Sequence, residues 1–224
     1  MPPEPDPDPE ARGVRLTVVL LALTVVSGLI DAVSFLSLRH VFTANMTGNV
    51  VVLGFAAAGA AGFSVPHTVT SLFCFLVGAT AGGRVAARFG GGGSRRNWTR
   101  LTLAVEAALV GAAAVVAFVA PGHSRTTYAL IALTAVAMGL RNATVRKLAV
   151  PDLTTTVLTM TLTGLVSESP RGGTRAGRRT AAVLAMLAGA TGGAWLVLHG
   201  HQAVPLLIAA LASGVLAVVA SGRE

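Results

Sequence analysis

Cysteine is nearly absent from this sequence, since Cys74 is the only one and lies within an apolar run. A single cysteine forms no intrachain disulfide and supplies no CxxC pair of the kind found in redox centres and zinc sites. The five histidines lie near the ends of apolar segments, and none has a cysteine or carboxylate at metal-ligand spacing: His40, His67, His123, His199 and His201. We therefore expect no metal and no other cofactor.

Charged residues are also scarce, at 12% of the chain, and only nine are acidic against 17 that are basic. A basic excess suggests nucleic acid, but these arginines fall between apolar segments, where they determine membrane topology. No nucleic-acid partner is expected. Apolar residues make up 53% of the chain, which places it in a lipid bilayer. The sequence also lacks GxSxG and HExxH motifs and a nucleophile with a matching base, so we do not expect an enzyme.

Long apolar segments fill most of the chain. The first 13 residues are rich in proline and acid and predict a disordered tail, 1–13, which lacks the basic start and cleavage site of a secretory signal. Eight apolar segments follow: 14–38, 41–63, 65–87, 101–120, 126–140, 153–166, 180–198 and 204–220. The sixth is about 21 Å long as a helix and rich in threonine, and the second opens with the polar run "TANMTGN". Both are predicted to be broken or re-entrant, because polar backbone at membrane depth must be buried by protein or reached by water.

Short sequence matches divide the chain into two halves. "GLIDA" at 28–32 returns as "GLRNA" at 139–143, and "LVGATAG" at 76–82 returns as "LAGATGG" at 187–193; both pairs are 111 positions apart. "TANMTG" at 43–48 resembles "TMTLTG" at 159–164, and "GAAAVVA" at 111–117 resembles "GVLAVVA" at 214–220. We therefore predict membrane repeat 1 at 14–121 and membrane repeat 2 at 122–224.

Arginine clusters constrain how often the chain crosses. One cluster lies between the third and fourth segments and another between the sixth and seventh, and both are expected to be cytoplasmic. Eight spans would place them on opposite faces. Six spans with two broken segments place both clusters and both termini inside and make the second half an inverted copy of the first. Seven spans, with only the sixth segment failing to cross, is the alternative. The predicted fold is an all-α polytopic membrane protein.

Two acids lie within apolar segments, where a charge costs about 3 kcal/mol at the membrane centre. Asp31 lies well inside the first segment, and we expect Arg141 or Asn142 as its partner. Glu106 is closer to a segment end, which predicts contact with water near the membrane surface. The small residues Gly78 and Gly82, like Gly189 and Gly193, are four apart and predict close helix packing, which leaves a homo-oligomer open.

The polar residues of the broken segments predict a site between the two halves. The predicted site residues are Asp31, Asn45, Thr47, Gly48, Asn49, Asn142, Thr155, Thr156 and Thr159. If the halves are inverted, the two polar stretches meet near the pseudo-twofold axis. The threonines have an alternative role in helix packing, since threonine also bonds its own backbone one turn earlier.

Two regions resemble a known family. "GLIDAVSFLSLRHVFTANMTGNVVVLG" and "RNATVRKLAVPDLTTTVLTMTLTGL" are similar to the signature regions of the YoaK-like bacterial membrane proteins, a family defined as a domain of unknown function. The matching positions are Asp31, Phe42, Asn45, Thr47, Gly48 and Asn49, then Asn142, Pro151, Asp152, Thr154, Thr155, Thr156, Thr163 and Gly164. The resemblance implies a multi-pass protein of the bacterial inner membrane and implies no activity.

Two functions remain open on these observations. The first is a small secondary transporter or permease for a small polar solute, which the repeated halves, the broken segments and the buried acid favour. The second is a non-catalytic membrane protein that binds a lipid or a protein partner, which the small-residue packing faces would equally serve.

Overall fold

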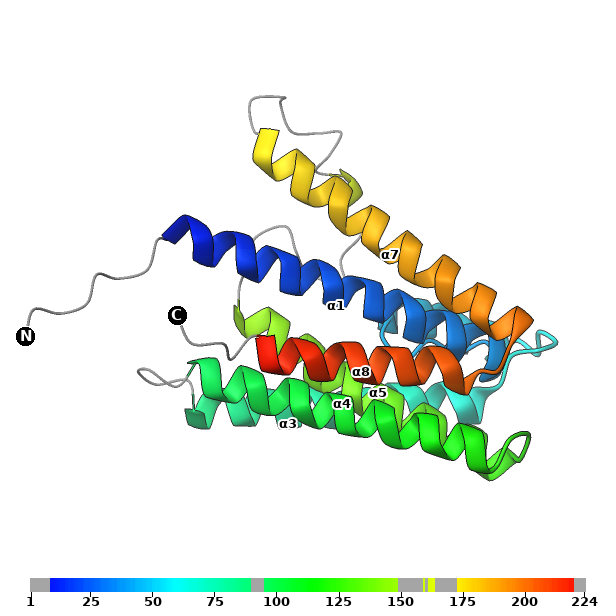
Figure 1. Cartoon of the computed structure of the whole chain (residues 1–224). Coiled ribbons are helices and arrows are strands. Elements are labelled where there is room, and N and C mark those ends of the chain that lie inside the picture. The colour runs from blue at the N-terminus through cyan, green and yellow to red at the C-terminus, as the bar shows by residue number, and fades with distance from the viewer. Residues whose placement is uncertain (1–8, 90–94, 149–158, 160, 164–172, 220–224) are drawn as a thin grey trace, which may run out of the picture.

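The computed structural model describes residues 9–89, 95–148, 159, 161–163 and 173–219 and is entirely helical over its regular elements (Figure 1). The helices are α1 (Pro9–Ser37), α2 (Met46–Ala57), α3 (Val65–Phe89), α4 (Arg95–Val119), α5 (Ser124–Leu148), α7 (Gly173–His199) and α8 (Ala203–Val219). Helix α1 begins inside the stretch predicted to be a tail, with proline at its first position, where no intrahelical N–H is needed.

Six of these helices cross the bundle from end to end. Five are long and apolar enough to span a membrane, and α8, with 17 residues, is about 25 Å long. Helix α2 has only 12 residues, or about 18 Å, which is too short for a hydrocarbon core of about 30 Å. The protein is therefore a polytopic helical membrane protein whose second apolar segment is broken, as predicted. The predicted sixth segment lies mostly outside the described residues.

The two ends of the bundle differ in charge. Helix α1 begins and α8 ends at the same end (Figure 1), which fits six crossings. We call this end the arginine end, because it carries the basic residues near the helix termini: Arg84, Arg88, Arg100, Arg146, Lys147, Arg178 and Arg179. The opposite, histidine end carries His40, His67, His123, His199 and His201, together with Arg39 and Arg125. The basic excess makes the arginine end the expected cytoplasmic side.

The helices follow one another across the bundle in the order α7, α1, α8, α4, α5, α3. The closest pairs are α3 with α5, α1 with α7 and α4 with α8, while α4 also packs on α5 and α1 on α8. Corresponding helices of the two sequence halves run in opposite directions: α1 against α5, α3 against α7 and α4 against α8 (Figure 1). The first helix of each half packs on a helix of the other half, α1 on α7 and α5 on α3.

Glycines allow the two outer pairs to touch backbone to backbone. A Cβ at Gly139 would collide with the Phe75 carbonyl and lie 2.7 Å from the Ala79 nitrogen. A Cβ at Gly28 would lie 2.5 Å from the Met186 carbonyl oxygen and 2.7 Å from the Ala190 nitrogen. Each of these residues in α1 and α7 is 111 positions from its counterpart in α5 and α3. The small-residue pattern thus places α1 on α7 and α5 on α3 in the same way.

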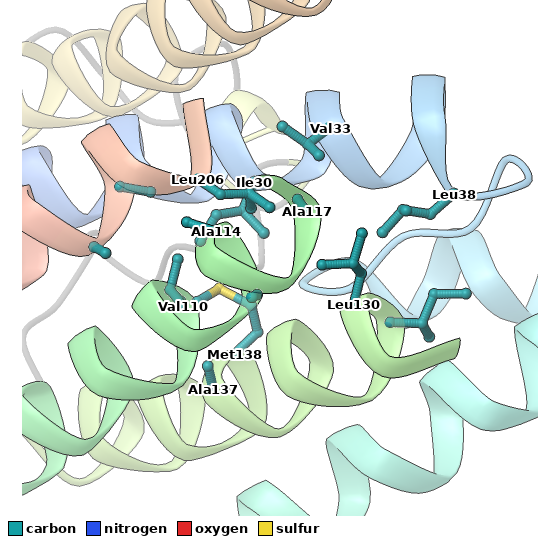
Figure 2. Packing of buried hydrophobic residues seen from close by; sticks show 14 of the residues in the cluster. Ile30, Val33, Leu38, Val110, Ala114, Ala117, Leu130, Ala137, Met138 and Leu206 are labelled. Atoms are coloured by element: carbon teal, nitrogen blue, oxygen red, sulfur yellow. The ribbon is translucent and has the colours of Figure 1, made fainter. Parts of the chain in front are cut away.

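Apolar side chains pack between the central helices. The larger cluster lies toward the histidine end and includes Ile30, Val110, Leu130, Met138 and Leu206, none more than 1% exposed (Figure 2). A smaller cluster toward the arginine end includes Leu20, Leu23 and Leu103. Large apolar residues such as Phe73, Leu76 and Leu198 face outward, as expected of a surface that contacts lipid.

Candidate functional site

The chain turns back into the bundle after α1. Arg39 and His40 both have positive φ, 64° and 57°, a left-handed conformation that is uncommon for residues other than glycine. Ring contacts hold the turn, because Phe35 stacks on Phe42 and meets His40 edge-on, with centroids 4.8 and 5.3 Å apart. His40 also bonds the carbonyl of Gly62 through Nδ1 (3.1 Å). The segment from Leu38 to Ala57 therefore enters and leaves at the histidine end.

Asp31 anchors the returning chain. Its carboxylate is 7% exposed, and Oδ1 accepts a hydrogen bond from the backbone N–H of Ala44 (3.1 Å), while the N–H of Thr43 also faces it. The carboxylate thus supplies acceptors to backbone groups that have no helix at that point. Of the two predicted partners, Arg141 and Asn142, Arg141 is bonded to another acid, Glu106. The hydrogen bond that Asp31 accepts comes instead from the loop backbone.

Two asparagines of the polar run have different roles. Asn45 caps α2, accepting from the N–H of Gly48 (3.1 Å), and its side chain is exposed. Asn49 is fully buried, where Oδ1 accepts from the N–H of Phe42 (2.8 Å) and Nδ2 donates to the carbonyl of Phe42 (2.6 Å). Asn49 also donates to Ser71 of α3 (3.1 Å). Asn49 therefore holds the loop at Phe42 against α3, whereas Asn45 lies exposed at the N-terminal tip of α2.

A cavity of about 850 Å³ lies at this tip. Its walls come from the start of α2, from α3 and from the last turns of α5: Ala44, Asn45, Met46, Thr47, Phe75, Ala79, Gly83, Asn142, Ala143, Val145, Arg146 and Lys147. Arg146 and Lys147 are exposed near the end of α5, so the cavity opens toward the arginine end. The returning segment thus enters from the histidine end, whereas the charged residues of the cavity lie near the arginine end.

The structure brings some of the predicted site residues together. Asn45, Thr47 and Asn142 line the same cavity, and Asp31 bonds to Ala44, which lines it too. Gly48 packs under the ring of Phe42, and Asn49 faces the loop, so neither of them lines the cavity. Thr159 is exposed and is not a lining residue. Thr155 and Thr156 lie outside the described residues.

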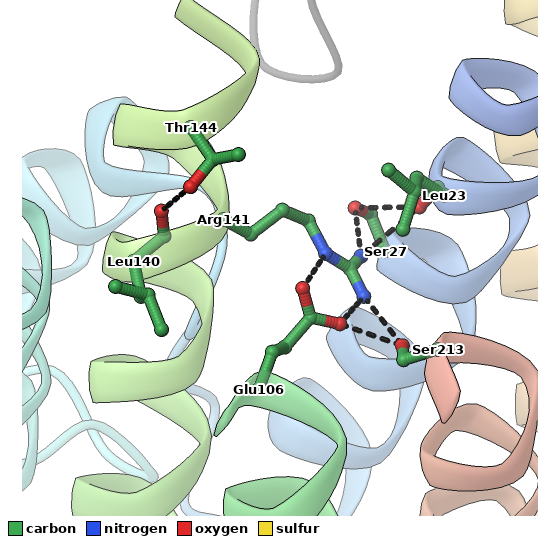
Figure 3. A network of polar contacts seen from close by, with 7 residues as sticks. All are labelled: Leu23, Ser27, Glu106, Leu140, Arg141, Thr144 and Ser213. Carbon is green, nitrogen blue, oxygen red and sulfur yellow. Dashed lines mark hydrogen bonds and ion pairs between the residues drawn. The ribbon is translucent and has the colours of Figure 1, made fainter. Parts of the chain in front are cut away.

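A second polar centre, around Arg141, lies between the two apolar clusters along the helices, and Figure 3 shows its contacts. Arg141, 1% exposed, donates from Nε to Glu106 (2.9 Å) and from Nη2 to the other oxygen of the same carboxylate. It also donates to the Leu23 carbonyl and to Ser27, both at 3.0 Å, and to Ser213 at 3.2 Å. Ser213 in turn donates to Glu106 (2.6 Å). One guanidinium therefore joins the four central helices, α1, α4, α5 and α8.

The expectation that Glu106 contacts water near the membrane surface is wrong, since this side chain is fully buried. Sequence position suggested the surface because Glu106 is near the start of an apolar segment, but α4 begins at Arg95 and extends well beyond it. Ser27 and Ser213 were not predicted as polar partners. The available signal was an arginine inside α5, which carries no acid of its own, and two acids inside other apolar helices, Asp31 and Glu106. The contact between helices was needed to choose Glu106 over Asp31.

Comparison with known proteins fits this architecture. Residues 19–219 match the family described as "Protein of unknown function (DUF1275)". The chain is 34% identical over 164 residues to UPF0700 transmembrane protein YoaK of Bacillus subtilis (strain 168), covering 70% of this chain and 68% of that protein. No solved structure matches the chain. With a family match over most of its length and a transmembrane relative of this similarity, the chain belongs to the YoaK-like DUF1275 family of multi-pass membrane proteins.

Proposed function

We propose that the protein is a small secondary transporter of the bacterial inner membrane that moves a small polar solute by alternating access. The observation that carries this proposal is the cavity at the tip of α2, where a helix begins within the membrane beside polar side chains from both halves. Broken helices that end at a midplane cavity are a recurring feature of secondary transporters. No catalytic role is proposed.

The arrangement of the halves supports the same proposal. The glycine contacts of α1 with α7 are matched, 111 positions later, by those of α5 with α3, and corresponding helices run in opposite directions (Figure 1). We interpret this as an inverted repeat. In such a fold, exchanging the conformations of the two halves turns a site that is open to one side into a site that is open to the other.

The alternative is a non-catalytic protein that binds a lipid or a protein partner. A groove for a partner would need to lie on the outer surface, whereas this cavity lies between the tip of α2 and the helices α3 and α5 and takes polar side chains from both halves of the chain. The cavity geometry therefore favours passage of a solute.

Cysteine labelling from the two sides of the membrane tests the proposal. In a Cys74→Ser background, Thr47→Cys probes the cavity, Ala60→Cys the histidine end and Leu76→Cys the lipid-facing side of α3. A membrane-impermeant maleimide is applied to right-side-out and inside-out vesicles. Thr47→Cys is expected to react from the arginine side, Ala60→Cys only from the opposite side, and Leu76→Cys, 62% exposed on an outward face, from neither.

Transport itself is measured with purified protein in proteoliposomes, by uptake from a panel of small polar solutes. A transported solute is expected to protect Thr47→Cys from the maleimide and to increase its labelling from the far side. A cavity that the reagent cannot reach from either side, or uptake equal to that of protein-free liposomes across the panel, would favour the partner-binding alternative.

A further inference from the structure

We infer that the cavity takes a small organic carboxylate with an apolar body. This inference rests on the proposed function for its biological meaning and names the substrate class of that site.

The charge of the lining is positive. Arg146 and Lys147 contribute two cationic side chains, and no acid is present among the described lining residues. Neither of the two buried acids nearby is a lining residue; Glu106 is paired with Arg141, and Asp31 accepts from the backbone of Ala44. An anion entering from the arginine end therefore meets attraction that no described lining carboxylate offsets.

Neutral donors stand at the inner end. The first N–H groups of an α-helix have no intrahelical partners. In α2, the side chain of Asn45 accepts a hydrogen bond from the N–H of Gly48, and the backbone carbonyl of Asn45 accepts one from the N–H of Asn49. The remaining first-turn residues, Met46 and Thr47, are those that line the cavity. The amide of Asn142 and the hydroxyl of Thr47 add side-chain hydrogen-bonding groups at the same depth. The positive end of α2 thus reinforces the two cations.

The rest of the wall is apolar. Phe75, Ala79 and Val145 line the cavity between its charged mouth and the tip of α2. A strongly hydrated inorganic ion gains nothing from such a wall, whereas a hydrocarbon body gains about 25 cal/mol for each Å² that leaves water. The volume of about 850 Å³ is within the range of small-molecule sites. An organic anion fits the whole lining better than phosphate or chloride does.

Matched carboxylate and amide probes test the inference. Thermal unfolding of the purified full-length protein in detergent is followed with sodium benzoate and sodium butyrate, each against benzamide or butyramide, and with inorganic phosphate and phosphatidylglycerol. Arg146→Gln removes a cation of the lining. Arg88→Gln is the control, because Arg88 is exposed in the last turn of α3 at the same end and is not a lining residue.

A carboxylate is expected to raise the unfolding temperature while its amide does not. Arg146→Gln should weaken the apparent affinity at least about tenfold, the loss of one charge-assisted hydrogen bond, and Arg88→Gln should leave it unchanged. The inference is overturned if amides act like carboxylates, if both substitutions have equal effects, or if none of the carboxylates shifts unfolding. Stabilisation by phosphate alone, or an Arg146-dependent effect of phosphatidylglycerol alone, would instead assign the site to an inorganic anion or a lipid headgroup.

The same probes separate this inference from the proposed function. Arg146-dependent binding of benzoate without any uptake in proteoliposomes would keep the carboxylate site and reject transport. Uptake of a neutral or cationic solute that is insensitive to Arg146→Gln would keep transport and reject the carboxylate.

Discussion

Removal of Glu106 is expected to destabilise the protein severely, because it leaves Arg141 charged and buried. In the native structure the guanidinium has the two carboxylate oxygens of Glu106, two serine hydroxyls and one backbone carbonyl as acceptors. Glu106→Leu removes the only negative charge in that set. Breaking one side of a buried ion pair costs about 3–5 kcal/mol, and arginine cannot lose its proton to reduce this cost.

The reciprocal and double substitutions measure the coupling energy between Glu106 and Arg141. Arg141→Met leaves a glutamic acid that can bind a proton, so its cost is expected to be smaller than that of Glu106→Leu. The double variant buries no charge and should lie within about 2 kcal/mol of the wild type, since apolar replacements of buried pairs are often neutral or stabilising. The coupling energy between the two sites should therefore reach about 3 kcal/mol.

Unfolding by titration with sodium dodecyl sulfate measures these free energies in a Trp195→Phe background, where the fluorescence of the buried Trp98 is the reporter. Thr144→Val is the matched control, because its hydroxyl is equally buried but bonds only the carbonyl of Leu140 in its own helix (2.9 Å); we expect a loss below about 1 kcal/mol. A double variant as unstable as the sum of the single variants would refute the coupling, and a larger loss from Arg141→Met than from Glu106→Leu would refute the charge argument.

Three further outcomes follow from backbone and loop contacts. Gly139→Leu should force α5 away from α3 and cost at least about 2 kcal/mol in the same titration, whereas Gly192→Ala, with nothing within 4 Å of the new Cβ, should be neutral or slightly stabilising. Asn49→Ala should cost about 1–3 kcal/mol, because it leaves the N–H of Phe42 without its side-chain partner, while the carbonyl of Phe42 keeps the hydroxyl of Ser71; a loss below about 0.5 kcal/mol would show that water replaces the amide. Arg39→Gly should be tolerated and Arg39→Val should not, since φ is 64° there, and equal unfolding midpoints for the two variants would contradict the left-handed turn.

Segment length and small-residue spacing were enough to predict much of the fold. A 12-residue α2 follows from the polar run at the start of the second apolar segment, since such a run cannot continue a lipid-exposed helix. Glycines four apart correctly indicated close packing faces. They could not indicate the partner helix: Gly78 packs on α5 and Gly189 on α1, each in the opposite half of the chain, and small residues fit any equally flat neighbour.

The candidate site was less accessible to sequence reasoning. Asn45 and Asn49 are four residues apart in one polar run, yet the first lines the cavity and the second is sealed against Phe42. This division follows the left-handed turn at Arg39 and His40, a conformation that is uncommon for residues other than glycine and that the sequence did not indicate. The partner of Arg141 was also beyond reach, because the choice between Asp31 and Glu106 is made by the contact of α4 with α5.

Differences between the corresponding positions of the two halves explain why the cavity opens at one end. Position 146 is arginine and position 147 is lysine at the mouth of the cavity, whereas the residues 111 positions earlier, Phe35 and Leu36, are apolar. Phe35 stacks on Phe42 and touches His40, so the equivalent place at the histidine end is filled by packed rings. Charged side chains favour water at the first place, and ring packing excludes water from the second. None of these rings lines the cavity, so in the proposed mechanism a solute that leaves toward the histidine end needs a path past the tip of α2 that the packed rings of the turn now fill.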